Sequence, residues 1–130
     1  MEHGRLFQLT AEAGALTVTF VRGLPKSHVF HELGGQLLAS GTSTEANYRA
    51  AQRARSPADF IAKLKIVEEE ADESMLWIDR LLAAKLPAGL VSDADRLRDM
   101  FDQILALTIR SIKTTRTRHL GRPASPRRRR

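Results

Sequence analysis

The sequence predicts an all-α protein that folds as an antiparallel up-and-down four-helix bundle over residues 1–119. Apolar side chains recur at three- and four-residue spacing in four separate segments, which is typical of helices with one buried face. The connections between these segments are short and contain Gly, Pro or Ser. Short connections make consecutive helices antiparallel neighbours, and 130 residues are the size of one domain.

The first helix is predicted over residues 5–22. Its apolar positions share one helix face, and they are Leu6, Leu9, Ala13, Leu16, Phe20 and Leu24. Gly14 and the β-branched residues at 17–19 lower the helix propensity, so packing against other helices must support this segment. Gly23 and Pro25 mark its end.

The second helix is predicted over residues 27–54, with Ser27 as a candidate N-cap. Three glycines, Gly34, Gly35 and Gly41, fall inside this helix, where an exposed Gly costs about 1 kcal/mol relative to Ala. We therefore expect these glycines either to permit a close approach of a neighbouring helix or to mark a kink.

The third helix, residues 56–85, has the strongest pattern and follows the second with almost no loop. Ser56 is a good N-cap, Pro57 suits the first helical position, and the Asp59 carboxylate can reach back to the cap. The apolar positions are Phe60, Leu64, Val67, Ala71, Ile78 and Leu81, widened by Ile61, Met75, Trp77 and Leu82. So wide an apolar stripe is expected to pack on more than one neighbour.

The fourth helix is predicted to start near Ser92 or Asp93 and to fade around Thr117. The positions expected to face inward are Leu97, Phe101, Ile104, Leu105, Thr108, Ile109 and Ile112. From Gly121 onward the sequence combines Pro and Arg with no apolar anchor beyond Ala124, so residues 120–130 are predicted to form a disordered, Arg-rich C-terminal tail.

Four short motifs follow one another in the middle third of the chain. They are Gln36-Leu37-Leu38 with Ser40-Gly41-Thr42-Ser43; Glu45-Ala46-Asn47-Tyr48; Ser56-Pro57-Ala58-Asp59-Phe60; and Glu70-Ala71-Asp72-Glu73 followed by Trp77. In these motifs the chain resembles the four helix bundle protein family, which includes proteins encoded in 23S rRNA intervening sequences and the accessory protein of diversity-generating retroelements. The resemblance implies a non-enzymatic homo-oligomer, a pentameric ring, and a role like that of the accessory protein, which binds nucleic acid and assists a reverse transcriptase.

The basic residues are unevenly distributed along the chain. The formal net charge is +6, yet the first 109 residues carry 12 Lys and Arg against 15 Asp and Glu. From Arg110 onward there are nine Lys and Arg and no acidic residue. The retroelement accessory protein has a basic bundle, whereas the bundle predicted here is mildly acidic. This difference shifts the expected nucleic-acid contacts to the C-terminal arginines and to the turn between the second and third helices.

We predict a nucleic-acid interface from two groups of basic side chains, because guanidinium groups suit phosphate oxygens and phosphate neutralisation releases counterions. The first group is Arg49, Arg53, Arg55 and Lys63, with Lys65 nearby; the second is Arg110, Lys113, Arg116, Arg118, Arg122, Arg127, Arg128, Arg129 and Arg130. The alternatives are a solvated helix end, a solubilising tail, and a surface for acidic lipids, although no apolar anchor supports the last.

The remaining polar residues indicate structural roles and no catalytic residue. The residues assigned to structure or oligomer contacts are Asn47, Ser56, Asp59, Glu70, Glu73 and Trp77. For the two glutamates, a solvated acidic face is the alternative interpretation. His28 and His31 lie one turn apart, but without a third histidine nearby or any Cys we expect no metal and no other cofactor. No nucleophile elbow, phosphate loop or Glu-x-x-His pair occurs.

These observations favour a nucleic-acid-binding accessory protein, with a protein–protein scaffold as the alternative and an enzyme disfavoured. The absence of Cys excludes disulfide and thiolate chemistry. The N-terminal segment lacks the features of a signal peptide, and the longest apolar run is too short to span a bilayer. A cytoplasmic protein without a membrane partner is therefore expected.

Overall fold

The computed structural model of the chain describes residues 2–120, and within them the fold is helical throughout. The elements are α1 (Glu2–Arg22), α2 (His28–Ala51), α3 (Pro57–Ala83), α4 (Ala88–Thr115) and a short π-helical segment, η1 (Arg116–Leu120). No strand occurs in this part of the chain, so the predicted all-α four-helix bundle is confirmed. The Arg-rich tail from residue 121 onward lies outside the described residues.

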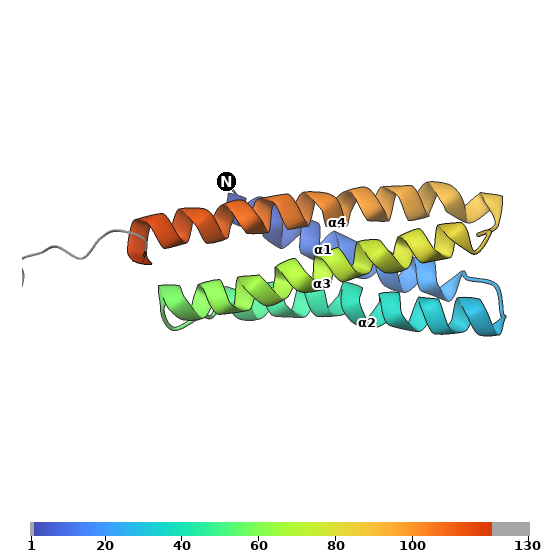
Figure 1. Cartoon of the computed structure of the whole chain (residues 1–130), viewed down its shortest axis with the longest axis horizontal. Helices are drawn as coiled ribbons and strands as arrows, with labels where there is room; N and C mark the ends of the chain where they lie inside the picture. Colours follow the sequence, from blue (N-terminus) through green and yellow to red (C-terminus); the bar gives the residue numbers. More distant parts are fainter. Residues whose placement is uncertain (1, 121–130) are drawn as a thin grey trace, which may run out of the picture.

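Consecutive helices run antiparallel along one long axis (Figure 1). α1 and α3 each pack against both α2 and α4, so the four helices form a closed ring of neighbours. α1 has 21 residues and α4 has 28. In Figure 1 the end of α4 and the start of α3 extend beyond the start of α1. That end of the bundle is therefore built mainly from α2, α3 and α4.

The start of α3 is where the sequence predicts it, but α2 ends earlier than predicted. Instead of continuing to residue 54, α2 stops at Ala51. Arg53 N–H donates to the carbonyl of Ala50 and Ala54 N–H to that of Ala51, both at 3.0 Å. These bonds to the third preceding residue tighten the chain into a turn. The turn between α2 and α3 is accordingly longer than the sequence indicates.

The predicted start of α4 near Ser92 or Asp93 is wrong, because α4 begins at Ala88. Pro87 occupies the N-cap position with φ −55°, and its carbonyl accepts a 2.9 Å hydrogen bond from Leu90 N–H. The fixed φ of proline suits the start of a helix, and no side chain caps α4 here. The capping pattern at residues 92–95 lies inside the helix.

The core is made from the inner faces of all four helices. Its largest fully buried side chains are Leu6, Phe20, Leu37, Tyr48, Leu64, Ile78, Leu81, Leu97, Phe101 and Ile104. Two predictions for α4 need correction: Ile109 is 45% exposed, and Leu105 is only partly buried. The buried stripe passes through Leu107, Thr108, Ser111 and Ile112. Thr108 and Ile112 were predicted to face inward, whereas Leu107 and the polar Ser111 were not.

Two of the three glycines predicted to matter in α2 lie close to a neighbouring segment, Gly41 to α1 and Gly34 to Leu24 just after α1. A Cβ at Gly41 would lie 2.8 Å from Thr17 Cγ2, and one at Gly34 would lie 2.7 Å from Leu24 Cδ1. Gly35 is exposed and has open space around it. Close approach therefore explains Gly34 and Gly41.

Within residues 2–120, none of the helices combines the length and apolar character that crossing a membrane requires.

Candidate nucleic-acid interface at one end of the bundle

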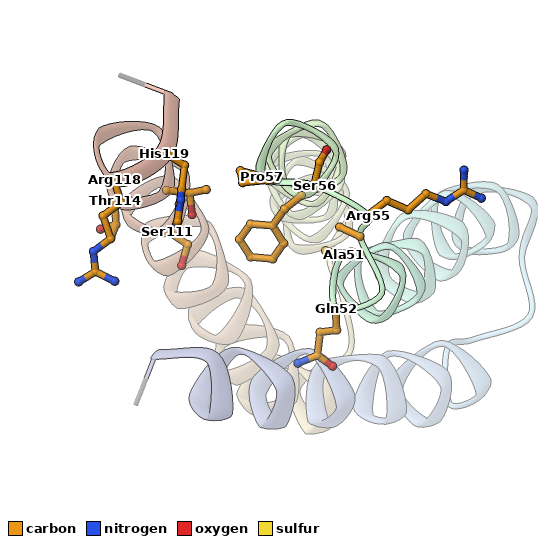
Figure 2. A pocket seen from close by; sticks show the side chains of 12 residues that line it. Ala51, Gln52, Arg55, Ser56, Pro57, Ser111, Thr114, Arg118 and His119 are labelled. Atoms are coloured by element: carbon orange, nitrogen blue, oxygen red, sulfur yellow. The ribbon is translucent and has the colours of Figure 1, made fainter. Parts of the chain in front are cut away.

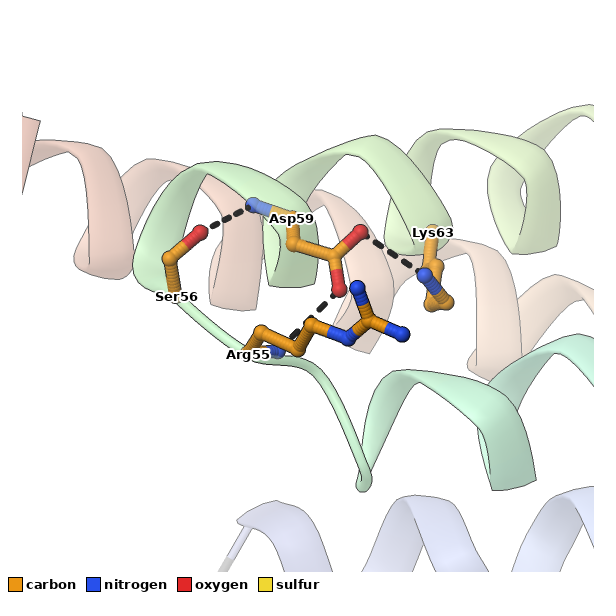
Figure 3. A network of polar contacts seen from close by, with 4 residues as sticks. All are labelled: Arg55, Ser56, Asp59 and Lys63. Carbon is orange, nitrogen blue, oxygen red and sulfur yellow. Dashed lines mark hydrogen bonds and ion pairs between the residues drawn. The ribbon is translucent and has the colours of Figure 1, made fainter.

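The turn between α2 and α3 is held by one carboxylate. Ser56 Oγ accepts a 3.1 Å hydrogen bond from Asp59 N–H, which confirms Ser56 as the N-cap. Asp59 Oδ2 accepts a 3.1 Å bond from Arg55 N–H, and Asp59 Oδ1 lies 2.7 Å from Lys63 Nζ (Figure 3). The Asp59 carboxylate therefore reaches one residue beyond the predicted cap. It fixes the backbone of Arg55 relative to α3.

Lys63 forms an ion pair with Asp59, and this pairing makes Lys63 less available for its predicted contact with phosphate. The hydrogen bond from Lys63 is the main reason why the pKa of Asp59 lies below its ordinary value, and the Arg55 N–H bond is the second. A phosphate at this position would have to compete with a carboxylate already held at 2.7 Å. Lys63 thus organises the turn.

A cleft of about 920 Å³ opens beside this turn. We call it the end cleft, and its lining residues are Ala51, Gln52, Ala54, Arg55, Ser56, Pro57, Phe60, Ser111, Thr114, Thr115, Arg118 and His119. Figure 2 shows the two walls, with Ser56 and Pro57 on one side and Ser111 and Thr114 on the other. No lining residue is acidic. The end cleft is thus a polar and cationic opening with some apolar wall.

The cations of the end cleft stand at its rim. In Figure 2 the guanidinium groups of Arg55 and Arg118 point outward, away from each other. Both side chains are exposed, as is that of His119. Positive charge is therefore available on both sides of the opening.

The inner part of the end cleft carries hydroxyl and amide groups. Ser111 is only 4% exposed, and within residues 2–120 its hydroxyl makes no hydrogen bond that the structure records. Gln52 is hydrogen-bonded to the phenol of Tyr48. Burial raises the pKa of Tyr48, and this hydrogen bond acts in the opposite direction. Gln52 therefore has a supporting contact in the core, whereas Ser111 is available to a ligand.

A second, smaller groove of about 470 Å³ runs between α3 and α4 near the same end. We call it the outer groove, and it is lined by Lys65, Glu68, Ile109, Ile112, Lys113, Arg116 and Thr117. The structure thus brings Lys65 next to Lys113 and Arg116, which are about fifty positions away in the chain. We call the surface formed by Arg53, Arg55, Lys65, Lys113, Arg116 and Arg118 the basic end.

The other predicted basic residues are placed differently. Arg49 lines a small cavity with Phe7, Thr10, Ala11 and Glu45, beside α1 and away from the end cleft. Arg110 is exposed on α4. Arg122 and the run Arg127, Arg128, Arg129 and Arg130 lie outside the described residues. The structure therefore brings part of the predicted set together on one surface.

The residues predicted for structure or oligomer contacts have local partners. Asn47 is partly buried and donates to Ser43 O and Ser43 Oγ, both at 2.9 Å, so these bonds stay within α2. A buried polar contact does join α2 to α3, from Ser40 Oγ to Ser74 Oγ at 2.8 Å, and the sequence did not predict it. Two isolated serines give no distinctive pattern in a sequence.

The acidic segment of α3 contains two partly buried glutamates, Glu68 and Glu70. Burial raises the pKa of Glu70, and the neighbouring charges of Glu73 and Glu69 raise it further. Glu73 is exposed. Trp77 is partly buried, and within residues 2–120 its buried indole N–H has no hydrogen-bond partner. Their predicted roles at a subunit interface stay predictions.

No group of three or more His, Cys, Asp or Glu in residues 2–120 is arranged to hold a metal ion. His28 and His31 are both exposed at the start of α2.

Comparison with protein-family models gave no match, and comparison with curated protein sequences gave none. Among solved structures, the chain is similar to a protein of unknown function from the S23 ribosomal protein family of Bacteroides thetaiotaomicron VPI-5482. The two share 29% sequence identity with a TM-score of 0.78, over 87% of this chain and 99% of the other. The likeness supports the all-helical bundle.

Proposed function

We propose that this protein is a non-enzymatic nucleic-acid-binding accessory protein of the four helix bundle protein family, and that its basic end contacts the phosphate backbone. One observation carries the proposal: two basic segments far apart in the chain meet at one end of the bundle, around a cleft without acidic residues. Exposed Arg and Lys on one surface are the electrostatic footprint of phosphate binding. The solved neighbour bears the name of a ribosomal protein family, which favours RNA as the nucleic acid.

The proposal includes a cytoplasmic homo-oligomer, a pentamer by the resemblance, that assists another protein such as a reverse transcriptase. Large apolar side chains that are at least 37% exposed support self-association, and they are Phe7, Val18, Val29, Leu38, Ile66, Leu76 and Ile109. Analytical ultracentrifugation of the full chain tests this part separately. A monomer at micromolar concentration would refute it.

A protein–protein scaffold is the second candidate. It is favoured by the outer face of α3, where exposed Ile66 and Leu76 flank the acidic residues of 68–73. Partners that stay bound at high salt and after nuclease treatment would support the scaffold, because phosphate contacts weaken steeply with salt.

The main test is binding of labelled RNA and duplex DNA to the full chain, measured by fluorescence anisotropy over a salt series. The test variant is Arg55→Gln with Arg118→Gln. The matched control is Arg22→Gln with Arg80→Gln, which removes the same charge from the last turns of α1 and α3. A cation near a helix C-terminus stabilises the helix modestly, and the control variant loses this stabilisation at both of its positions.

Removal of one phosphate contact should reduce the slope of log affinity against log salt by about 0.9 on duplex DNA. We therefore expect the slope of the test variant to fall by up to about 1.8 and the control to keep the original slope. A chain ending at Leu120 measures the contribution of the tail in the same assay. Absence of binding by the full chain at low salt would refute the proposed function.

A further inference from the structure

The end cleft has features that phosphate contact alone does not require. A surface that only neutralises phosphates needs exposed cations, and the outer groove already supplies them. The end cleft adds an interior that contains Phe60, Ala51 and Pro57 together with the hydroxyls of Ser111 and Thr114. Its volume of about 920 Å³ falls in the range of sites that enclose a small organic group, about 300–1,000 Å³.

Ser111 points most directly to a ligand. Its side chain is 4% exposed, it lines the end cleft, and no hydrogen bond of its hydroxyl is present in residues 2–120. The other buried hydroxyls of α1 and α2, such as those of Thr10, Thr17 and Thr44, donate to a carbonyl one turn earlier. Ser111 is a buried residue, yet its Oγ is not among the buried atoms without a partner, which in residues 2–120 are Trp77 Nε1 and Thr108 Oγ1. A hydroxyl that lines an opening and makes no hydrogen bond to the protein can bind a polar group that enters from outside.

We propose that the end cleft receives one unpaired nucleotide of the bound strand, with the base inside the cleft and the flanking phosphates at its rim. This inference rests on the proposed function and names the form of nucleic acid that the site selects. Arg55 and Arg118 point outward on the two sides of the opening. A strand that crosses the end of the bundle therefore meets a cation before and after the cleft.

The interior of the cleft suits a base of any identity. Phe60 provides an aromatic wall, and every base has a face that can stack on such a ring. Ser111, Thr114 and Thr115 carry hydroxyls, which both donate and accept hydrogen bonds. No carboxylate in the lining repels the phosphates. The site should therefore prefer unpaired over paired nucleotides, with little preference among the bases.

The local backbone favours this assignment. Arg118 and His119 belong to η1, where the last turn of α4 widens into a π-helix. π-helical segments are rare and are often found at functional sites. A fully paired duplex offers no free base, because unpairing one costs energy before it can enter.

The test compares two RNA hairpins with equal numbers of phosphates, one with a blunt stem and one with a shorter stem and a single-stranded 3′ overhang. Binding to the full chain is measured by fluorescence anisotropy at fixed salt. We expect the overhang hairpin to bind about fivefold or more tightly, since stacking of one base on an aromatic side chain has at least this effect.

The test variant is Ser111→Ala with Thr114→Val and Thr115→Val, which removes the hydroxyls with little change of shape and no change of charge. The matched control is Thr117→Val, which lies on the same helix end but lines the outer groove. The test variant should lose the preference for the overhang while it still binds the blunt hairpin, and the control should keep the preference. Phe60→Leu offers the same readout should the triple variant fail to fold.

Four results would overturn the proposal. Equal binding of both hairpins by the unaltered chain would refute the unpaired-nucleotide site, and so would a test variant that keeps the preference for the overhang. Neither result would refute the proposed phosphate contacts of the basic end. Failure of the unaltered chain to bind either hairpin at low salt would refute the proposed function as well. Displacement of the overhang hairpin by a free mononucleotide at equal phosphate concentration would assign the cleft to a small nucleotide instead.

Discussion

Two glycines of α2, six positions apart, should respond in opposite directions to the same substitution. Gly35→Ala adds a methyl group where nothing lies within 4 Å, so the variant should gain the helix propensity of alanine, about 1 kcal/mol. Gly41→Ala adds the same methyl group 2.8 Å from both Cγ2 and Oγ1 of Thr17. Real Cβ atoms do not approach other atoms so closely, and either α1 or the Thr17 side chain must move.

The magnitude follows from the environment of Thr17. Thr17 is fully buried, and its hydroxyl donates a 2.7 Å hydrogen bond to the carbonyl of Ala13. Overpacking a core costs about 1–3 kcal/mol, and displacing this hydrogen bond places Gly41→Ala in the upper part of that range. After the gain in helix propensity, the net destabilisation should be about 1–2 kcal/mol.

The assay is urea denaturation followed by circular dichroism, on Gly41→Ala, Gly35→Ala and the double variant Gly41→Ala with Thr17→Ala. In the Thr17→Ala background, Gly41→Ala should destabilise less than it does in the unaltered chain, because alanine at position 17 lacks the two atoms that the new methyl group would meet at 2.8 Å. Stabilisation by both single alanine substitutions would contradict the reasoning, since it would mean that α1 and α2 are not in close contact at Gly41.

Three further predictions concern polar contacts and are checked by urea denaturation. Ser74→Ala should lower the unfolding free energy by about 1 kcal/mol by breaking the buried 2.8 Å contact with Ser40, and the variant with both serines changed to alanine should be destabilised by less than the sum of the single changes. Arg98 binds Asp79 through two hydrogen bonds that hold the pKa of Asp79 below its ordinary value. The stability that this pair contributes is therefore present above the unfolded pKa of about 3.9 and disappears as the pH falls through the folded pKa. Asp79→Asn should thus destabilise the protein at pH 7, and this effect should shrink as the pH is lowered below about 3.9. Burial and neighbouring charges raise the pKa of Glu70. The ionised carboxylate therefore lowers the free energy of unfolding, and Glu70→Gln should stabilise the protein at pH 7. This stabilisation should disappear below the unfolded pKa of about 4.3, where the carboxyl is protonated in both states.

The sequence predicted the positively charged part of the candidate site better than its shape. Arg55 and Arg118 were identified from charge alone, and both line the end cleft. Lys63 was identified by the same criterion, yet the structure holds it at 2.7 Å from Asp59. Charge is a property of single residues, whereas the availability of a charge depends on its neighbours in space.

The uncharged part of the cleft gave no signal in the sequence. Ser111 and Gln52 lie almost sixty positions apart, and neither belongs to a motif. They become neighbours of one opening because α4 returns antiparallel beside the turn between α2 and α3. The predicted inward position of Ile109 failed for a related reason: polar Thr108 and Ser111 occupy the buried stripe of α4 beside Ile112.

By itself, the sequence determined the helices, the cap at Ser56 and the excess of positive charge toward the C-terminus. These features depend on residues within one or two helical turns of each other, where propensity, capping and periodicity act. The tertiary structure was needed to show that Gly41 faces Thr17, that Lys65 lies beside Lys113 and Arg116, and that the end cleft exists. The physical reason is that helix packing sets distances between residues remote in the chain, and a cleft is made of such distances.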